Sequence, residues 1–185
     1  MGINPRDYSY NLAVGCQNST SLHSDPLGIL NQAYEENTNK DIVGTCTACV
    51  VCIEGTTLRG LNLGDSGFFV VRDGEIIFRS KDQQHRFNMP YQIGYESRDT
   101  PFDGDKYEFT LCQNDIVVLA TDGVLDNVFP DQLANLVKTH ENSTGQDIAI
   151  QIAGASSVAG AQLFGESPFA KAARLLGYEE SGGKE

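Results

Sequence analysis

Alternating apolar and polar positions predict short strands through the first two-thirds of the chain. These strand patterns lie near residues 45–53, 58–63, 67–72, 75–79 and 107–111. Successive side chains of a strand point to opposite faces, which produces this period of two. The dipeptide Asp73-Gly74 separates two of the patterns and is a strong hairpin-turn signal, so Asp73 is interpreted as a turn residue. The stretch 80–105 has no clear period and predicts an irregular surface segment.

Helical periodicity appears on both sides of the strand region. Asp25-Pro26 predicts a helix start, with the carboxylate as N-cap and the proline in the first turn. One face of this helix would carry Leu27, Leu30, Ala33 and Tyr34. From Pro130 the spacing becomes helical again. Residues 1–24 are polar and lack a period, so we expect an irregular N-terminal segment followed by one domain over residues 25–185. Segregated strands and helices indicate an α+β fold.

The candidate chemistry follows an apolar run from Ile116 to Ala120, which predicts a buried strand. The run leads Asp122 into a turn that Gly123 permits, and Asp126 follows four residues later. Carboxylate oxygens are hard ligands that suit Mg²⁺ or Mn²⁺. These residues therefore predict a metal site. The alternative from the same residues is an ordinary turn, with Asp126 capping the next helix.

A second aspartate has the same setting. A strand pattern over 58–63 runs into Gly64-Asp65-Ser66-Gly67, and the glycines beside Asp65 permit unusual backbone angles or close approach. Asp65 and Asp122 thus each lie at a strand end beside glycine. This repeated arrangement suggests a shared carboxylate cluster.

Three motifs in the same order resemble core motifs of the metal-dependent type 2C protein phosphatases. They are Gly44-Thr45-Cys46-Thr47-Ala48, Leu63-Gly64-Asp65-Ser66-Gly67 and Ala120-Thr121-Asp122-Gly123-Val124-Leu125-Asp126-Asn127. Within that family the chain is similar to the branch of mitochondrial phosphatases and their plant counterparts. That similarity lies in the segments 83–92 and 167–170. The resemblance covers roughly residues 25–183 of the chain.

The resemblance implies a β-sandwich of two antiparallel sheets flanked by helices, in a four-layer αββα arrangement. It implies a serine/threonine protein phosphatase that hydrolyses phosphoserine and phosphothreonine with a metal-activated water. Asp122 would bind the paired catalytic Mg²⁺ or Mn²⁺ ions, and Asp65 and Asp126 would help hold a further metal. Residues 44–48 would form a core strand rather than supply ligands, and for Thr45 or Thr47 a packing role is favoured over a catalytic one. The early arginine that grips the substrate phosphate in the family has no assignable counterpart in this chain, so no further catalytic side chain is identified.

Two expected features of the family have no counterpart here. Nothing before Gly44 resembles the Asp-Gly motif that supplies a bridging carboxylate, and the chain ends at Gly182-Gly183-Lys184-Glu185, where a final acidic pair is expected. We therefore expect a domain that is incomplete at both termini. The alternative function is a noncatalytic phosphatase-like binding module or an inactive truncated product. Hydrolysis of small phosphate esters would use the same site.

The charge composition bears on which binding partners are expected. Lys and Arg total 13 and Asp and Glu total 25, which gives a formal net charge of −12. This charge argues against nonspecific nucleic-acid binding, and it is mildly unfavourable for the phosphoprotein substrate that the resemblance implies unless metals offset it locally. No apolar run approaches the roughly 20 residues of a membrane-spanning helix, so we expect no membrane insertion. No pattern indicates an oligomeric state.

Five cysteines indicate a reducing, intracellular compartment rather than a disulfide framework. By resemblance this is the cytoplasm, a mitochondrion or a plastid, and no targeting segment is visible. Strand alternation sends Cys46 and Cys52 to one face and Cys49 to the other, so we expect apolar thiols rather than a zinc site. For His85, the loop's hydrogen bonding is favoured over a catalytic role.

Overall fold

The computed structural model describes residues 4–40 and 42–184. Residues 1–3 of the predicted N-terminal segment, and Asp41 and Glu185 of the predicted domain, lie outside the described residues. The chain divides into two compact units. The first unit comprises Met1–Ser66 and Ser80–Cys112, and the second comprises Gly67–Arg79 and Gln113–Glu185.

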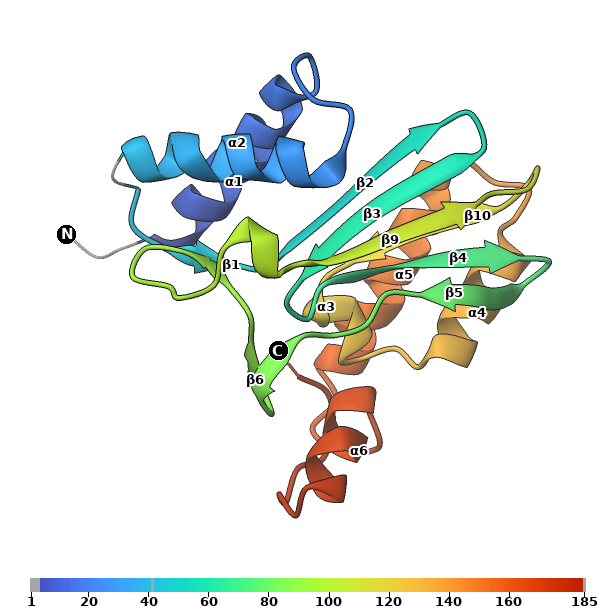
Figure 1. Cartoon of the computed structure of the whole chain (residues 1–185). Helices are drawn as coiled ribbons and strands as arrows, with labels where there is room; N and C mark the ends of the chain where they lie inside the picture. The colour runs from blue at the N-terminus through green and yellow to red at the C-terminus, as the bar shows by residue number, and fades with distance from the viewer. Residues whose placement is uncertain (1–3, 41, 185) are drawn as a thin grey trace. The chain divides into compact units, whose positions relative to one another are not determined.

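The described residues form helices and strands in the order that Figure 1 shows. The helices are α1 (Pro5–Ser19), α2 (Pro26–Asn39), α3 (Asp122–Leu125), α4 (Pro130–Thr139), α5 (Gly145–Gly160) and α6 (Pro168–Leu175), with the 3₁₀ helix η1 (Pro101–Asp103). The strands are β1 (Thr45–Cys46), β2 (Ala48–Glu54), β3 (Thr57–Leu63), β4 (Gly67–Arg72), β5 (Glu75–Arg79), β6 (Gln84–Arg86), β7 (Met89–Pro90), β8 (Ile93–Gly94), β9 (Asp105–Thr110) and β10 (Ile116–Ala120). All pairings between these strands are antiparallel.

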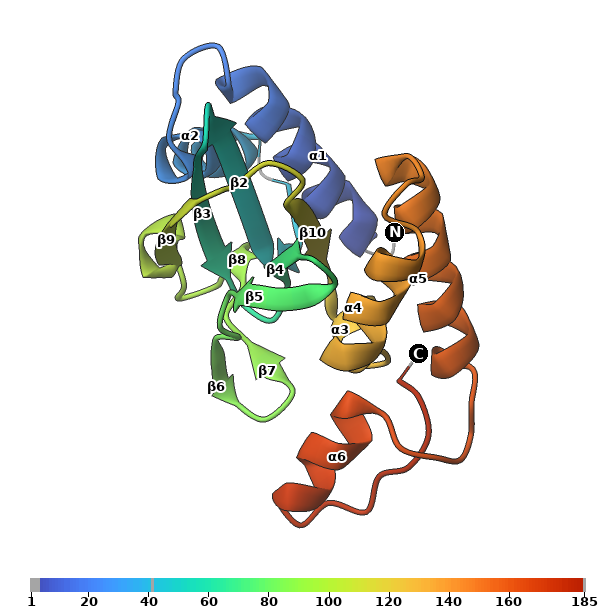
Figure 2. The same cartoon turned by 90° about the vertical axis from the view of Figure 1, so that its right-hand side faces the viewer.

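The first unit is built on the three-stranded sheet β2-β3-β9. Helix α2 begins as predicted, because the Asp25 carboxylate accepts a hydrogen bond from the Gly28 amide at 3.0 Å. Figure 2 shows α1 and α2 beside this sheet, and α2 packs against β2 and β3. The buried core of the unit consists of Tyr8, Leu12, Leu30, Ala33, Ala48, Leu61, Leu63 and Ile93.

Helix α1 corrects the expectation of an irregular segment over residues 1–24. The Asn4 side chain caps the helix by accepting from the Arg6 amide at 3.2 Å. Tyr8 and Leu12 bury one face, and a Cβ on Gly15 would contact Ala33 of α2. The prediction was wrong because the apolar positions are few, and packing against a neighbouring helix stabilises what the sequence period alone does not show.

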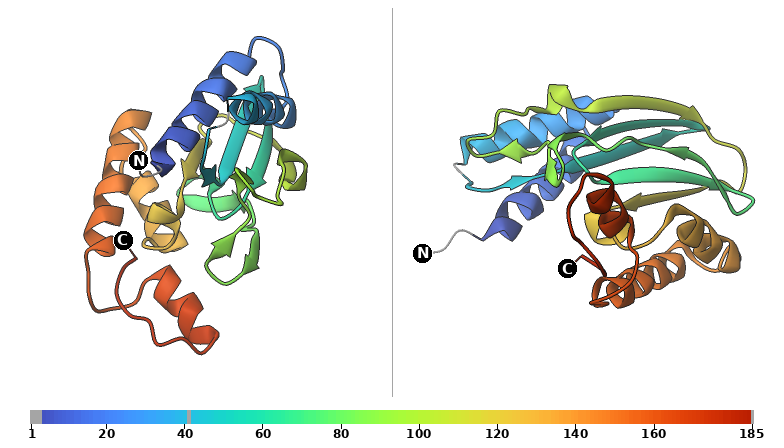
Figure 3. Two further views of the ribbon diagram at one scale, coloured as in Figure 1. Left: turned by 90° about the vertical axis from the view of Figure 1, so that its left-hand side faces the viewer. Right: turned by 90° about the horizontal axis from the view of Figure 1, so that it is seen from below.

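The second unit is built on the three-stranded sheet β10-β4-β5. Its β4–β5 hairpin turns at Asp73 and Gly74, whose φ angles are 52° and 80°, so the predicted turn is confirmed. Helix α4 packs against β5 and α5, and Figure 3 shows these helices from two further directions. The core of the unit consists of Phe69, Val71, Val128, Leu133, Val137, Ile148 and Ile152.

The predicted α+β fold class is confirmed, since antiparallel sheets are flanked by helices in each unit. Two strand predictions need correction. The strand over 45–53 is interrupted at Thr47 between β1 and β2, and the irregular stretch 80–105 contains the short strands β6, β7 and β8. The latter carry no clear alternation because each spans only two or three residues. None of the described helices combines the length and apolar character that a membrane crossing requires.

An ion pair of the second unit joins two neighbouring strands. Arg72 Nε and Nη2 donate to the Asp115 carboxylate at 2.7 and 2.8 Å, and the Asp115 side chain has no exposed area. Because Arg72→Met removes two charge-assisted hydrogen bonds from a carboxylate with no exposed area, it should lower the free energy of unfolding by about 3 kcal/mol. Urea unfolding measures this loss.

The matched control is Arg59→Met on β3. Arg59 pairs with Glu54 and Glu108 at 3.4 and 3.3 Å, but both carboxylates are largely exposed. Its removal should cost below about 1 kcal/mol. Equal losses of unfolding free energy in the two variants would show that burial of Asp115 does not strengthen the contribution of its ion pair to stability.

The cysteines Cys46 and Cys49 lie half-buried, and burial raises their thiol pKa values to about 12, with the neighbouring Cys16 contributing at Cys46. Only about one thiol in ten thousand is then ionised at pH 8, and the thiolate is the reactive form. Iodoacetamide at pH 8 should therefore label the exposed Cys112 well before Cys46 and Cys49. Mass spectrometry of the peptides reads the order, and equal labelling rates in the folded protein would refute it.

Candidate metal centre

Asp122 and Asp126 are brought together at the end of β10. The chain passes from the strand through extended Thr121 into the single turn of α3, where Asp122 is the first residue and Asp126 is the C-cap. Residues four apart on a helix lie on the same face. The two carboxylates therefore share one side of the turn.

The Lys184 side chain contacts both carboxylates. Its Nζ donates to Asp126 Oδ2 at 2.6 Å and to Asp122 Oδ2 at 3.4 Å. The Lys184 side chain is 23% exposed, whereas Asp122 and Asp126 are 49% and 24% exposed. A cation thus lies between the two oxygens that the sequence predicts as metal ligands.

The pKa of Lys184 responds to two opposing effects. Partial burial lowers it, but hydrogen bonding and charge attraction from Asp126, together with the weaker influence of Asp122, outweigh burial and raise the pKa above its ordinary value. The ammonium form is therefore the one that the carboxylate pair holds.

Asn127 holds the C-terminal segment next to α3. It was not identified as a site residue from the sequence. It is 6% exposed, and its Nδ2 donates to the carbonyls of Gly123 and Lys184 at 3.0 and 2.8 Å. Its Oδ1 accepts from the Lys184 amide at 2.8 Å. Asn127 thus fixes the C-terminal segment to α3. Its place directly after Asp126 was the available signal, while nothing in the sequence pattern identified Lys184.

The alternative interpretation of this turn is not supported. Asp122 Oδ1 accepts a hydrogen bond from the adjacent Gly123 amide at 2.9 Å, whereas an Asx turn uses the amide two residues on. Asp126 does not cap the following helix, because the N-cap of α4 is Phe129. The Asp126 carboxylate is directed to Lys184 instead.

Asp65 lies in the first unit, between β3 and β4, whereas the other two aspartates lie in the second. Its loop is held tightly. Gly64 has a φ of 95°, and a Cβ there would lie 2.5 Å from the Tyr91 carbonyl oxygen. The Thr47 and Ser66 hydroxyls share a hydrogen bond of 2.7 Å, which supports packing roles for these side chains. That Asp65 joins one cluster with Asp122 and Asp126 remains a prediction.

The chemistry of the donor set fits a hard divalent cation. Asp122 and Asp126 offer carboxylate oxygens to one cation position, which the Lys184 ammonium marks. Mg²⁺ is commonly held by one or two carboxylates and several waters. Across residues 4–40 and 42–184 there is no group of three or more His, Cys, Asp or Glu side chains arranged for a metal. The pair thus supplies part of a coordination shell.

His85 has a hydrogen-bonding environment that supports its structural interpretation. Its Nε2 lies 3.0 Å from both carboxylate oxygens of Asp99, and its ring stacks on Tyr91 with centroids 4.2 Å apart. Asp99 Oδ2 also accepts from the Gln92 amide at 2.9 Å. These contacts join β6 to the loop that precedes η1.

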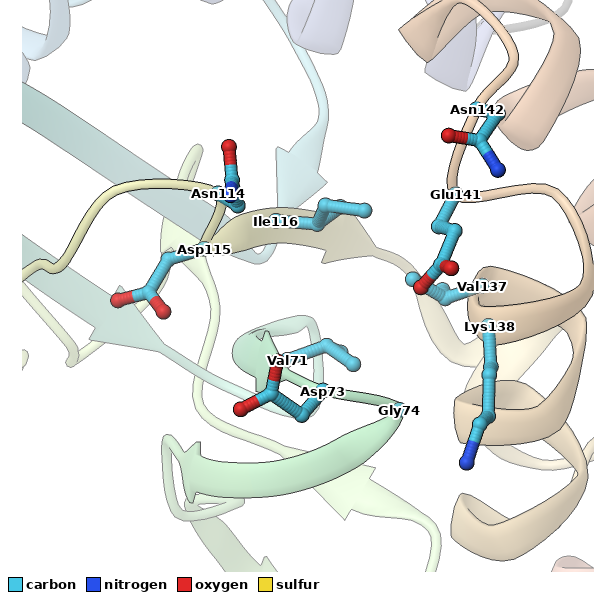
Figure 4. Close-up of a pocket in the computed structure, with 10 residues that line it drawn as sticks. All are labelled: Val71, Asp73, Gly74, Asn114, Asp115, Ile116, Val137, Lys138, Glu141 and Asn142. Carbon is cyan, nitrogen blue, oxygen red and sulfur yellow. The ribbon is translucent and has the colours of Figure 1, made fainter.

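A separate cavity of about 450 Å³ lies at the other end of β10 from Asp122. Figure 4 shows carboxylates of Asp73, Asp115 and Glu141 around it, with Lys138 on the helix side. Asp115 is already bonded to Arg72. This cavity contains none of the predicted site residues.

Comparison with known proteins identifies the relatives of the chain. A family model described as stage II sporulation protein E (SpoIIE) matches residues 16–158. The protein phosphatase PTC7 homolog of Danio rerio is 36% identical over 204 residues, which cover 99% of this chain and 68% of that protein. The probable protein phosphatase 2C 80 of Arabidopsis thaliana is 34% identical over 95% of this chain, which spans 42% of that protein's length.

Solved structures share the fold. The X-ray structure of the photosystem II phosphatase PBCP has a TM-score of 0.86 and 25% identity, covering 95% of this chain and 69% of that one. The catalytic domain of the serine threonine protein phosphatase PstP, in complex with two manganese ions, has a TM-score of 0.60 at 14% identity, covering 82% and 76% of the two chains. The latter likeness concerns the fold alone.

The expected family is thus supported at three levels: the ordered motifs around Asp65 and Asp122, the sequence relatives, and the shared fold. The alignment with the Danio rerio relative covers 99% of this chain. The chain belongs to the type 2C family of metal-dependent protein phosphatases.

Proposed function

We propose that the chain is a Mg²⁺- or Mn²⁺-dependent serine/threonine protein phosphatase, acting on phosphoserine and phosphothreonine of proteins. The observation that carries this proposal is the convergence of Asp122 and Asp126 on one cation position. Family membership supports the reaction class. The manganese ions named for PstP support the choice of metal.

Each residue of the site has a distinct task in this proposal. Asp122 binds the paired catalytic cations, and Asp126 beside it helps, with Asp65, to hold a further one. When bound, such cations lower the pKa of a water and aim it at the phosphate ester. The Gly123 amide orients Asp122 through its 2.9 Å hydrogen bond, and Asn127 keeps α3 fixed to the C-terminal segment. Fixed carboxylates need no rearrangement during the reaction.

Charge makes the cations necessary for substrate binding as well. The formal net charge of −12 opposes the approach of a phosphate group. A divalent cation between Asp122 and Asp126 would offset this repulsion where the phosphate binds. The free cysteines at positions 16, 46, 49, 52 and 112 support a reducing compartment. The cytoplasm, a mitochondrion and a plastid remain the predicted locations.

A second candidate function is a noncatalytic phosphatase-like binding module. It is favoured by the small number of ligands, since no described group of three or more His, Cys, Asp or Glu side chains is arranged to hold a metal. Paired metals must generate and orient the nucleophile together. A chain that retains only part of the ligand set would keep the fold and lose the reaction.

Phosphatase activity separates the two functions. The 185-residue chain should hydrolyse p-nitrophenyl phosphate with Mn²⁺ and lose this activity in EDTA. Asp122→Asn should reduce kcat/KM by about two orders of magnitude or more, because a neutral amide is a weaker metal ligand than a carboxylate. Asp131→Asn, at an exposed position of α4, makes the same charge change away from the site and should leave the rate within about twofold. Folded protein without turnover would support the binding module.

Thermal unfolding tests metal binding without requiring turnover. A ligand that binds only the folded state at 100 times its Kd adds about 2.7 kcal/mol of stability. Saturating Mn²⁺ should therefore raise the Tm of the wild type. Asp126→Asn should show a clearly smaller rise, whereas Asp131→Asn should match the wild type. An equal rise in all three proteins would place the bound metal elsewhere.

A further inference from the structure

We infer that Lys184 is a built-in competitor for the metal site, and that a divalent cation must displace its ammonium group from Asp122 and Asp126. This inference rests on the proposed metal-dependent function. It concerns a residue outside the predicted ligand set, and it gives the site two mutually exclusive occupants.

Hydrogen bonds hold the backbone of Lys184 and of the two residues before it. Asn127 bonds both its amide and its carbonyl at 2.8 Å. The Gly182 amide donates to the Gly165 carbonyl at 3.0 Å, and the Gly183 amide donates to the Gln162 carbonyl at 2.8 Å. Lys184 is thus presented to the carboxylates by a segment with a defined path, unlike a lysine on an open surface.

Close packing explains why two glycines precede Lys184. Gly182 has a φ of 80°, and a Cβ there would collide with the Gln162 carbonyl oxygen. A Cβ on Gly183 would collide with the carbonyl oxygen of Ala159 in α5. The Gly-Gly pair therefore lets the segment lie directly against the end of α5, which brings Lys184 within reach of α3.

Lys184 also contacts an aromatic ring through its ammonium group. Its Nζ lies 4.8 Å from the centroid of the Phe169 ring, in cation–π geometry. Partial burial, two carboxylate contacts and the aromatic ring together hold the ammonium group at one position. Such contacts offset the entropy that a long, mobile side chain loses when it is fixed.

The ammonium group and a metal cannot both use the same carboxylate oxygen face. Lys184 Nζ is 2.6 Å from Asp126 Oδ2, whereas Mg²⁺ binds such oxygens at about 2.1 Å. A divalent cation at this position would also repel the ammonium charge at short range. Lys184 therefore has to leave the carboxylates when the metal binds. The free energy of the Lys184 contacts makes the free energy of metal binding less favourable.

The test is Mn²⁺ titration by calorimetry of the full 185-residue chain and of variants at Asp126, Lys171 and Lys184. Lys184→Met keeps the apolar stem beside Phe169 and removes the charge, so it should bind Mn²⁺ about tenfold more tightly, equivalent to about 1.4 kcal/mol. Lys184→Arg keeps the positive charge and adds a planar guanidinium group that suits carboxylates. This variant should therefore bind Mn²⁺ no more tightly than the wild type. Lys171→Met removes an exposed lysine that lies over the Phe129 ring and should leave Kd unchanged.

The outcomes separate this inference from the proposed function. Tighter binding by Lys184→Met alone supports competition at the site. Binding by the wild type that Asp126→Asn weakens and Lys184→Met leaves unchanged would overturn the inference and keep the metal site. If Lys184→Met and Lys171→Met tighten Mn²⁺ binding equally, the change in net charge alone accounts for the tighter binding. That result would also overturn the inference. If folded wild type binds no Mn²⁺, both the site and the inference fail.

A second variant guards against misfolding of Lys184→Met. Lys184→Gln keeps a hydrogen-bond donor without the charge and should also tighten Mn²⁺ binding. Thermal unfolding supplies an independent reading: without metal both variants should be less stable than the wild type, and saturating Mn²⁺ should raise their Tm by more than it raises the wild-type Tm. A smaller rise than in the wild type would contradict competition.

Discussion

Two carboxylates one helical turn apart need a positive charge between them. Asp122 and Asp126 are placed together because β10 ends directly before the short helix α3. Like charges this close repel each other, and partial burial of Asp126 strengthens the repulsion. In a chain of net charge −12 the surroundings offer little general relief. The Lys184 ammonium supplies the compensating charge in this structure, and a divalent cation supplies it in the proposed enzyme.

The rest of the second unit serves to hold this turn. β10 pairs along β4, so the strand that carries Asp122 is fixed along its length. The buried Arg72–Asp115 pair joins the same two strands at the far end of β10. Asn127 then connects α3 to the returning C-terminal segment through three hydrogen bonds. Main-chain structure thus places the two aspartates, and the Gly123 amide and the Lys184 ammonium contact their carboxylates.

The sequence predicted those parts of the molecule where local pattern and structure agree. The strands β3, β4 and β5, the Asp73-Gly74 turn and the Asp25 cap follow from alternation and turn chemistry. Helix α1 was missed because its stability comes from packing against α2, and Tyr8 and Leu12 give too weak a period on their own. The interruption at Thr47 also depends on tertiary structure, since β1 pairs with β8 whereas β2 pairs with β3.

Local sequence pattern also decided which residues of the candidate metal site could be predicted. Asp122 and Asp126 were found because strand, turn and carboxylates lie within one short motif, whereas Lys184 follows Asp122 by 62 residues and carries no pattern. Its role depends on a contact that only the folded chain makes. The resemblance to type 2C phosphatases supplied the expected metals and reaction, and Asp65 remains a predicted ligand on that basis.

The most direct test of this account is anomalous diffraction from a crystal of the chain soaked in Mn²⁺. The account predicts a manganese peak at about 2.1–2.2 Å from carboxylate oxygens of both Asp122 and Asp126, with Lys184 Nζ moved away from them. A manganese ion bound only elsewhere, or Lys184 still bonded to both aspartates in protein with full manganese occupancy, would contradict it.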